Sequence, residues 1–332
     1  MARVEVVIAT YNRPIQLRRC LEGLAAQSLD DFAVTVVDDA SDLRIDETLS
    51  GDLRSRLDLK VVRSEENHGP GRSRNLGVER SSAELIAFID DDVVPDPDML
   101  KRHEEAYDSG PDNSIQFGPL KAPDDWEPTP WNLWEARTIA HEYRRMERGV
   151  YQATWRQFFT GNAFLARKHF QAVGGFNEAF TRAEDIELAY RLAAEGCTFR
   201  FVPDAIGWHY AERSRQSWQR IARDYARFDV AIDGLHPELN WLGVRNRERA
   251  DRHRLSKLGY AALSRVSGQR IGSEIAVRSA QLLHRCGAVG LAQPLLSFAY
   301  SVEYEAEMTE CLGSKAGLST SRSGSRPGSS PA

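Results

Sequence analysis

Residues 85–96 read LIAFIDDDVVPD, and this stretch decides the fold class. The run from Leu85 to Ile89 is short and wholly apolar, which is typical of a strand buried on both faces of a sheet. Three aspartates, Asp90 to Asp92, follow it at once. In open α/β sheets, ligands bind outside the carboxyl ends of the strands. The stretch therefore predicts a buried strand with an acidic site at its end.

The sequence around this stretch alternates between strand and helix patterns. Further strands are expected at residues 4–9, 33–37 and 59–62, and helices at residues 14–27, 71–80 and 97–109. Beyond residue 122 we expect helices at residues 131–147, 183–195 and 217–230, and strands at residues 198–202 and 205–210. Alternation of this kind predicts an α/β fold with a mostly parallel sheet covered by helices on both faces.

The chain has 332 residues, and at about 150 residues per domain it should hold roughly two domains. The α/β pattern extends over residues 1–235. Residues 236–312 turn basic and helical, which predicts a C-terminal helical extension. Residues 313–332 are dominated by Ser, Gly and Pro and cannot bury a core, so we expect a disordered tail.

Composition excludes several classes of protein. Apolar residues make up 42% and charged residues 27% of the chain, which is ordinary for a globular protein. The net charge is −5, which argues against a nucleic-acid partner. Four lone cysteines without a C-x-x-C pair, and no secretory signal, favour a cytoplasmic protein with reduced thiols. The apolar stretch from Cys286 to Tyr300 is too short to span a bilayer.

The three consecutive aspartates point to a metal ion. Carboxylates this close repel one another, so they need a cation or must share a proton. Mg²⁺ or Mn²⁺ accepts a few carboxylate oxygens and leaves positions open for phosphate. The alternative is that Asp92 or Asp96 simply caps the following helix.

A second acidic cluster, VVDDASD at residues 36–42, follows the second expected strand. An acidic residue there often hydrogen-bonds a nucleotide's ribose or base, and the alternative is an Asx turn. The turn after the first strand reads ATYNR, residues 9–13, and has no G-x-G-x-x-G. A dinucleotide-binding domain is therefore disfavoured.

The loop NHGPGRSRNLG, residues 67–77, combines glycines with Arg72 and Arg74. Glycines allow close approach of a ligand, the following helix can direct N–H groups at phosphate, and the arginines could pair with pyrophosphate. A plain loop before a helix is the alternative.

The stretch GGFNEAFTRAEDIELAYRL, residues 174–192, places Asp185 in the first turn of an expected helix, where it could act as a general base. Thr181 and Glu184 match a helix-capping box, which would account for Glu184 but not for Asp185. His209, after a later strand, is either structural or a metal ligand.

These motifs, in this order, resemble those of the family 2 glycosyltransferases, which have the GT-A fold. ATYNR, VVDDASD, the 67–77 loop, FIDDDV as the DxD motif, GGFNEAF and AEDIELAYRL carry the resemblance, which covers about residues 3–212. It implies a nucleotide-sugar donor (UDP-, GDP- or dTDP-sugar), Mn²⁺ or Mg²⁺, and a sugar or lipid-linked sugar acceptor. Cell-envelope polysaccharide or glycolipid assembly is the expected setting.

The resemblance also implies roles for individual residues. Asp185 would be the base that deprotonates the acceptor, with inversion at the anomeric carbon, and Asp92 and His209 would hold the metal. Tyr11 and Asp39 would lie near the base and Asp91 near the ribose. The full donor set is Ala9, Tyr11, Arg13, Asp39, Arg74, Asn75, Asp90 and Asp91. The acceptor side would include Gly161, Asn162, Glu184 and Trp155.

Three alternatives stay open at this stage. A sugar-1-phosphate nucleotidylyltransferase would need a Gly-rich loop after the first strand, which ATYNR lacks. A retaining transferase would differ only in its product anomer. A catalytically silent nucleotide-binding module could keep the same fold. The basic helices after residue 243 either form a solvated face or touch an anionic membrane, at the inner face of which the protein would then be peripheral.

Overall fold

The computed structural model describes residues 2–252 and 269–322. The chain divides into two compact units, one of residues 1–128 and 135–212, the other of residues 129–134 and 213–332. The last ten residues of the expected disordered tail lie outside the described part. The backbone at residues 313–322 belongs to a helix.

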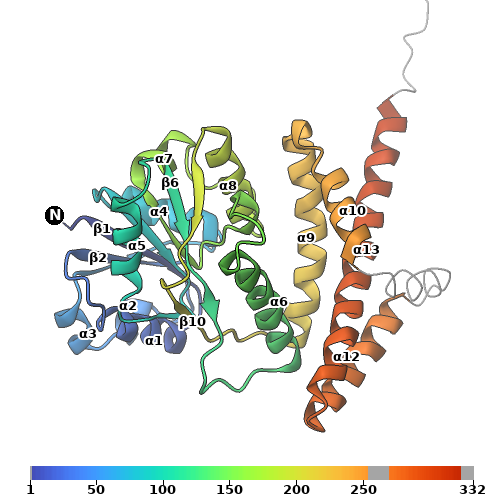
Figure 1. Cartoon of the computed structure of the whole chain (residues 1–332), viewed down its shortest axis with the longest axis horizontal. Coiled ribbons are helices and arrows are strands. Elements are labelled where there is room, and N and C mark those ends of the chain that lie inside the picture. The colour runs from blue at the N-terminus through green and yellow to red at the C-terminus, as the bar shows by residue number, and fades with distance from the viewer. Residues whose placement is uncertain (1, 253–268, 323–332) are drawn as a thin grey trace, which may run out of the picture. The chain divides into compact units, whose positions relative to one another are not determined.

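The first unit is built on a seven-stranded sheet with the order β3-β2-β1-β4-β8-β6-β9 (Figure 1). Its strands are β1 (Val4–Thr10), β2 (Phe32–Asp38), β3 (Leu59–Arg63), β4 (Leu85–Ile89), β6 (Ser114–Phe117), β8 (Asn162–Ala166) and β9 (Thr198–Phe201). Neighbouring strands are parallel except at β8, which runs antiparallel to β4 and β6. The prediction of a mostly parallel α/β sheet is confirmed.

Helices cover both faces of this sheet. They are α1 (Pro14–Leu24), α2 (Ile45–Thr48), α3 (Gly51–Arg56), α4 (Pro70–Glu79), α5 (Met99–Asp108), α6 (Pro130–Glu147, whose first turn belongs to the second unit), α7 (Arg167–Ala172) and α8 (Glu184–Ala194). Because side chains alternate along a strand, Val6 and Ile8 of β1 enter one core cluster and Val7 enters the other. Gly77 lets α4 approach β1 closely, since a Cβ there would lie 2.4 Å from a Val7 methyl carbon.

A second sheet has three strands, β5 (Val93–Pro95), β10 (Gly207–His209) and β7 (Leu120–Lys121). β10 lies within the strand expected at residues 205–210, but β5, β7 and the sheet that joins them were not predicted. Its strands have two or three residues each, too few to leave a readable alternation of polar and apolar residues. β10 nevertheless pairs antiparallel with β5, directly after the three aspartates. This small sheet matters most for the site.

The second unit is helical. Its main elements are α9 (Arg215–Leu235), a short 3₁₀ turn (Pro237–Leu239), α10 (Trp241–Arg252), α12 (Gln269–Arg285) and α13 (Val289–Arg322). Trp218 is buried against Trp134 and Tyr300, so these rings are core anchors. All of α9 groups with this unit, whereas the sequence suggested a boundary near residue 235; the domain limits themselves stay a prediction.

Cys20, Cys197, Cys286 and Cys311 are all free thiols. Over the residues that the structure describes, none of the helices combines the length and the apolar character needed to cross a bilayer.

Candidate active site

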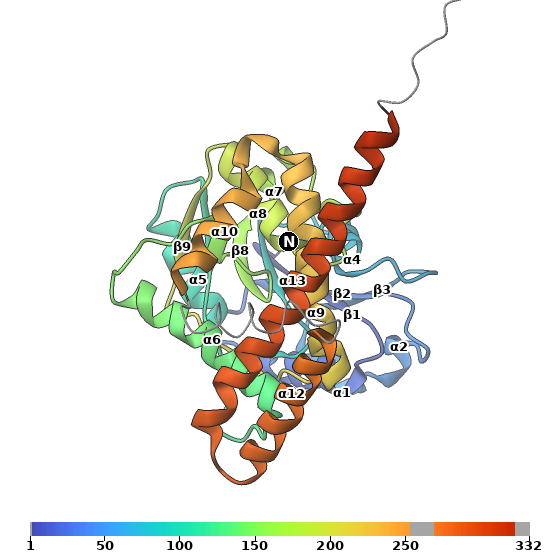
Figure 2. The same cartoon turned by 90° about the vertical axis from the view of Figure 1, so that its right-hand side faces the viewer.

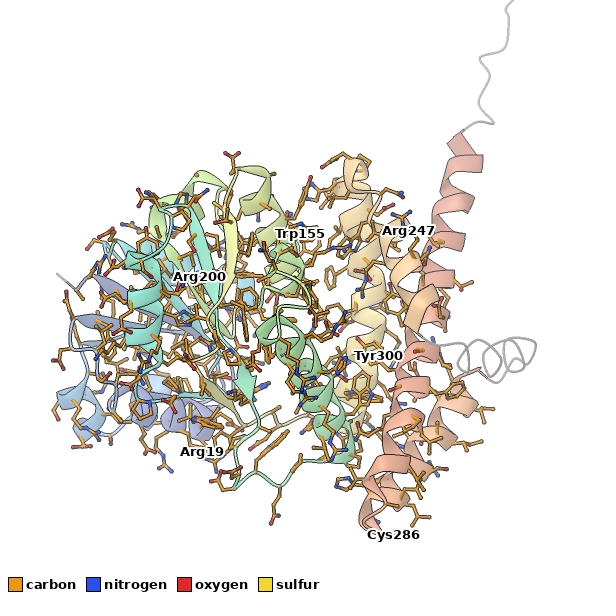
Figure 3. The ribbon with its side chains drawn as sticks, viewed as in Figure 1. Arg19, Trp155, Arg200, Arg247, Cys286 and Tyr300 are labelled. Carbon is orange, nitrogen blue, oxygen red and sulfur yellow. The ribbon has the colours of Figure 1, made fainter. Side chains whose placement is uncertain are left out.

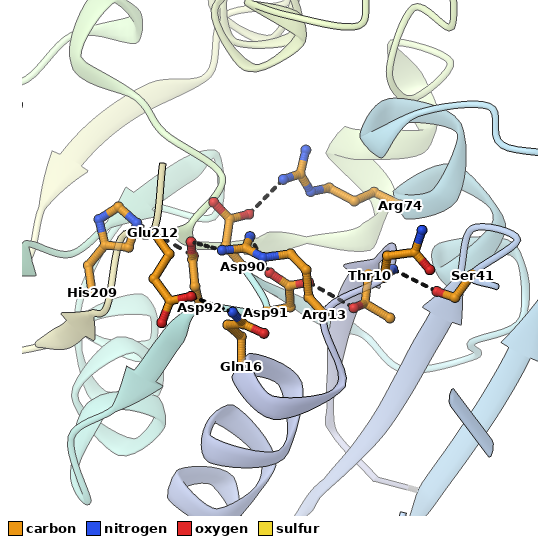
Figure 4. Close-up of polar contacts among 11 residues, drawn as sticks. Thr10, Arg13, Gln16, Ser41, Arg74, Asp90, Asp91, Asp92, His209 and Glu212 are labelled. Atoms are coloured by element: carbon orange, nitrogen blue, oxygen red, sulfur yellow. Dashed lines mark hydrogen bonds and ion pairs between the residues drawn. The ribbon is translucent and has the colours of Figure 1, made fainter. Parts of the chain in front are cut away.

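The small sheet brings together two residues that lie far apart in the sequence. His209 pairs in register with Val93, and the N–H of Tyr210 donates to the Asp92 carbonyl at 2.9 Å. As a result, His209 Nε2 lies 3.5 Å from Asp92 Oδ1, and both side chains are largely buried. Figure 4 shows this pair at one end of the aspartate turn.

Arg13 spans two of the three aspartates. Its Nη1 donates to Asp91 and its Nη2 to Asp92, each at 2.8 Å, and the Thr10 hydroxyl donates to Asp91 at 2.8 Å (Figure 4). Arg13 follows β1 and the aspartates follow β4, and these neighbouring strands are parallel, so their carboxyl ends meet. The guanidinium thus offsets the repulsion between two buried carboxylates.

The environment pushes the pKa values of these two carboxyl groups apart. Burial raises the pKa of Asp91, more than Arg13 lowers it. Burial would also raise the pKa of Asp92, but His209 and Arg13 together hold it well below its usual range. Asp92 is therefore the carboxylate that stays ionised.

Arg74 links the aspartate turn to the acidic helix α8. This buried guanidinium donates to Asp90 at 2.7 Å and to Glu184 at 2.9 Å. Burial lowers the pKa of Arg74, but the two carboxylates outweigh it, so the pKa is raised and the side chain stays charged. The end of β4 and the start of α8 are thereby held together across 94 residues of sequence.

Asp185 lies in the first turn of α8, as predicted. The residue before the helix, Ala183, has a φ of 57°, a left-handed conformation that is uncommon for a residue with a Cβ. The alternative explanation of Glu184, a capping box with Thr181, is wrong. Ala183 is the N-cap and makes no side-chain cap, and the Glu184 carboxylate accepts from Arg74 instead. Burial and then the charge of Glu184 raise the pKa of Asp185 to about 7.

The remaining donor-side residues lie at the same edge of the sheet, at the ends of β1 and β2 and in α4. Both oxygens of Asp39 accept backbone N–H groups, from His68 at 3.1 Å and Gly69 at 2.8 Å, so Asp39 fixes the glycine loop at the start of α4. Asn75 exchanges two hydrogen bonds with the Phe176 backbone. Ala9 lies near the end of β1, and Tyr11, just after it, is 45% exposed.

Some of the predicted acceptor-side residues lie at the site, and others are buried in the structure behind it. A Cβ at Gly161 would lie 2.9 Å from an Asp90 carboxylate oxygen, so glycine there makes room for Asp90. Trp155 packs edge to face against Tyr190 of α8. Asn162 is buried, bonded to His103 at 2.9 Å and to the Ala205 carbonyl at 2.8 Å, and so supports the framework behind the site.

Thr10 and Ser41 also belong to the site and were not predicted from the sequence. Thr10 binds Asp91, and the Ser41 hydroxyl accepts from the Asn12 N–H at 2.8 Å, joining the loops after β1 and β2 (Figure 4). The rule that drew attention to the aspartates also applies to Thr10, because it is the polar last residue of β1.

The residues present fit a divalent cation that binds together with a ligand. Asp92 and His209 supply an ionised oxygen and an imidazole nitrogen, donors that Mn²⁺ accepts and that Mg²⁺ tolerates. Their separation of 3.5 Å is close to the roughly 3 Å between adjacent ligands in an octahedral shell. Within residues 2–252 and 269–322, no group of three or more His, Cys, Asp or Glu side chains is placed to hold a metal ion by itself. Further ligands would have to come from phosphate or water.

Comparison with protein families gives two matches. The model for glycosyl transferase family 2 matches residues 5–174, about half of the chain. A second model, described as the N-terminal domain of galactosyltransferase, matches residues 140–213, which include Trp155, Asp185 and His209.

Curated relatives include validoxylamine A glucosyltransferase from Streptomyces hygroscopicus subsp. jinggangensis, 31% identical over 310 residues. That match covers 82% of this chain and 71% of the relative. Chondroitin synthase from Escherichia coli is 29% identical over 237 residues, covering 62% of this chain but only 34% of the synthase. The chain thus spans only part of these relatives.

Solved structures share the fold at low sequence identity. A mannosyltransferase from Pyrobaculum calidifontis, in complex with GDP-Man and Mn²⁺, has a TM-score of 0.63 at 19% identity, covering 94% of this chain and 88% of the other. S. aureus TarS residues 1–349, in complex with UDP-GlcNAc, has a TM-score of 0.56 at 18% identity, covering 96% and 92%. The predicted GT-A fold is confirmed, and the chain belongs to glycosyltransferase family 2.

Proposed function

We propose that this glycosyltransferase moves a sugar from a nucleoside-diphosphate sugar to an acceptor hydroxyl, with a divalent cation and with inversion at the anomeric carbon. The observation that carries the proposal is the Arg74 link, which joins the aspartate turn to the helix that bears Asp185. Direct attack by the acceptor hydroxyl, in one step with inversion, needs a bound donor with its cation and one general base close to it. The GDP-Man, Mn²⁺ and UDP-GlcNAc complexes of the structural neighbours support the donor and cation classes.

Asp92 and His209 would hold Mn²⁺ or Mg²⁺, which would act as a Lewis acid toward the negative charge that develops on the leaving diphosphate. Arg13 keeps the Asp92 carboxylate in place through its second oxygen, and Asp91 stays beside it for the ribose. Since Asp92 and His209 are two donors and the described residues form no larger ligand group, we expect the cation and the donor diphosphate to bind cooperatively.

The other donor contacts follow from their position at the sheet edge. Tyr11, half exposed after β1, and Asp39 would border the base, beside Ala9. Asn75, Asp90 and Arg74 would border the diphosphate and sugar. Asp39 already accepts two backbone N–H groups, so its contribution would be to shape the base pocket as much as to touch the base.

Asp185 would act as the general base. As the acceptor oxygen bonds to the anomeric carbon, the bond from that carbon to the diphosphate breaks on the opposite side, and the acceptor proton passes to Asp185. A carboxyl group with a pKa of about 7 is well matched to this task near neutral pH. Glu184, Gly161, Asn162 and Trp155 would form or support the acceptor side.

For the acceptor we propose a broad class of compounds and no single molecule. Relatives named for validoxylamine A, chondroitin and hyaluronan suggest that acceptors vary within the family. We place this chain in the cytoplasm, in polysaccharide or glycolipid assembly, with a sugar or lipid-linked sugar as acceptor. A silent nucleotide-binding module of the same fold is the second candidate, and turnover separates it from the transferase.

A thermal-shift panel tests the donor site. UDP, GDP, dTDP and CDP are each added with and without Mn²⁺. We expect one nucleotide to stabilise the protein only with metal, by about 2.7 kcal/mol at 100 times its Kd. Asp92→Ala should abolish the metal-dependent part, whereas Asp204→Ala, an exposed aspartate outside the site, should not. No stabilisation by any nucleotide in the folded protein would contradict the proposal.

The pH dependence of kcat/KM tests the base. Asp185 must be ionised to accept a proton, so kcat/KM should rise with pH, by about tenfold per unit below a midpoint near 7, and then level off. Glu184→Gln removes the negative neighbour that raises this pKa, so the rising limb should move to lower pH. A limb that stays unmoved in Glu184→Gln, or a flat profile in the parent, would argue against Asp185.

A further inference from the structure

One face of α12 carries a row of largely exposed apolar side chains. Ile271, Ile275 and Leu282 are 65%, 60% and 63% exposed. Their spacing of four and seven residues aligns them in one stripe along the helix. Arg278 and Arg285 continue the same stripe, at positions three residues after Ile275 and Leu282.

This stripe is not needed to build the hairpin of α12 and α13, which lie side by side in Figure 2. The opposite face of α12 does that work, because Ala276, Val277 and Ala280 are fully or nearly fully buried and belong to one core cluster with Ala292 and Leu296 of α13. Among the residues that the structure describes, this core cluster therefore forms without the stripe. A row of exposed apolar side chains along one helix face is typical of an interaction surface.

A further exposed apolar side chain lies close to the turn between the two helices. Leu291 is 66% exposed just after the turn, and Cys286 lies at the end of α12 (Figure 3). From Ile275 to Val302 the sequence holds no Asp or Glu, although the whole chain has a net charge of −5. Arg278, His284 and Arg285 lie in this stretch. Glu274, just before it, is paired with Arg215 and Arg278.

We propose that the hairpin tip, defined as Ile275, Arg278, Leu282, Arg285 and Leu291, docks onto an anionic lipid surface. Two contributions hold an amphipathic helix at such a surface. Its apolar side chains enter the boundary between headgroups and acyl chains, and flanking arginines pair with lipid phosphates. A symmetric contact with a second copy fits less well, because pairing like surfaces would bring the arginines of both copies together. This inference does not depend on the proposed chemistry.

Co-sedimentation of the full chain with vesicles tests the docking. The vesicles contain phosphatidylcholine mixed with phosphatidylglycerol, or phosphatidylcholine alone. We expect binding to the anionic vesicles only, weakening as salt is raised. Each arginine near an anionic surface contributes about fivefold in affinity, and reversal of both charges in Arg278→Glu/Arg285→Glu should weaken binding by at least about 25-fold. Leu282→Asp/Leu291→Asp should also abolish it.

Matched controls distinguish a specific effect of the hairpin tip from a change in the protein's net charge or folding. Arg18→Glu/Arg44→Glu makes the same charge change at exposed arginines of the first unit, and Val150→Asp replaces an equally exposed valine. These should bind like the parent. All variants should keep the parent's melting temperature and its stabilisation by the donor nucleotide.

Three results would overturn the proposal. They are no binding of the parent to anionic vesicles, equal binding to neutral vesicles, and equal loss of binding in the first-unit controls. Light scattering tests the competing explanation, a contact with a second copy. That explanation would hold if the parent is an oligomer that does not bind vesicles and Leu282→Asp/Leu291→Asp dissociates it.

Discussion

An Asp185→Asn variant is expected to lose about 10²–10⁴-fold in kcat while it still binds the donor nucleotide. The amide cannot accept the acceptor's proton, but it has nearly the same shape, so the helix start and its Arg74–Glu184 pair should persist. Steady-state kinetics with the donor found by thermal shift, together with nucleotide-dependent stabilisation, measure the two effects separately.

Two further measurements test the role of Asp185. Asp204→Asn, at an exposed aspartate, should leave kcat within about twofold, since a surface substitution of this kind changes little. The anomeric configuration of the product, read by NMR, should be inverted relative to the donor. A retained configuration, or an Asp185→Asn variant with near-parental kcat, would remove Asp185 from the role of base.

The sequence predicted the part of the fold that depends on local pattern. Leu85 to Ile89 is β4, the helix at residues 131–147 is α6 with one further residue, and Asp185 lies in the first turn of α8. Local sequence is enough to identify these elements, as in the short, wholly apolar run that forms β4. The carboxyl-edge rule then brings Asp39 and the three aspartates to one side of the sheet.

Local patterns do not predict which residues meet across the fold, and only the family resemblance placed His209 with Asp92. His209 reaches Asp92 only because two three-residue strands, β5 and β10, pair in register, and strands so short have no readable period. The sequence suggested that Glu184 caps its helix. A buried guanidinium without a counter-charge would cost more free energy than a missing cap, so Glu184 binds Arg74 instead. A capping box is a local motif, and nothing local in the sequence reveals a cation that arrives from another helix.

The same buried arginine leads to the largest expected change in stability. Arg74→Met should destabilise the protein by about 3–5 kcal/mol, because it leaves the Glu184 carboxylate, whose side chain is 10% exposed, without its counter-charge. Asp90, at 37% exposed, can be hydrated and should contribute less. For a unit of this size the loss corresponds to roughly 6–20 °C in melting temperature, measured by calorimetry or circular dichroism.

Arg72→Met is the matched control, two residues earlier on the same helix. Arg72 is 52% exposed and pairs with Glu178 at 3.4 Å, so its loss should cost no more than about 1 kcal/mol. The double variant Arg74→Met/Glu184→Gln should recover much of the lost stability, because the uncompensated charge is gone. If Arg74→Met unfolds no earlier than Arg72→Met, or if Glu184→Gln adds to the damage instead of relieving it, the guanidinium is not what holds the aspartate turn to the helix of the base.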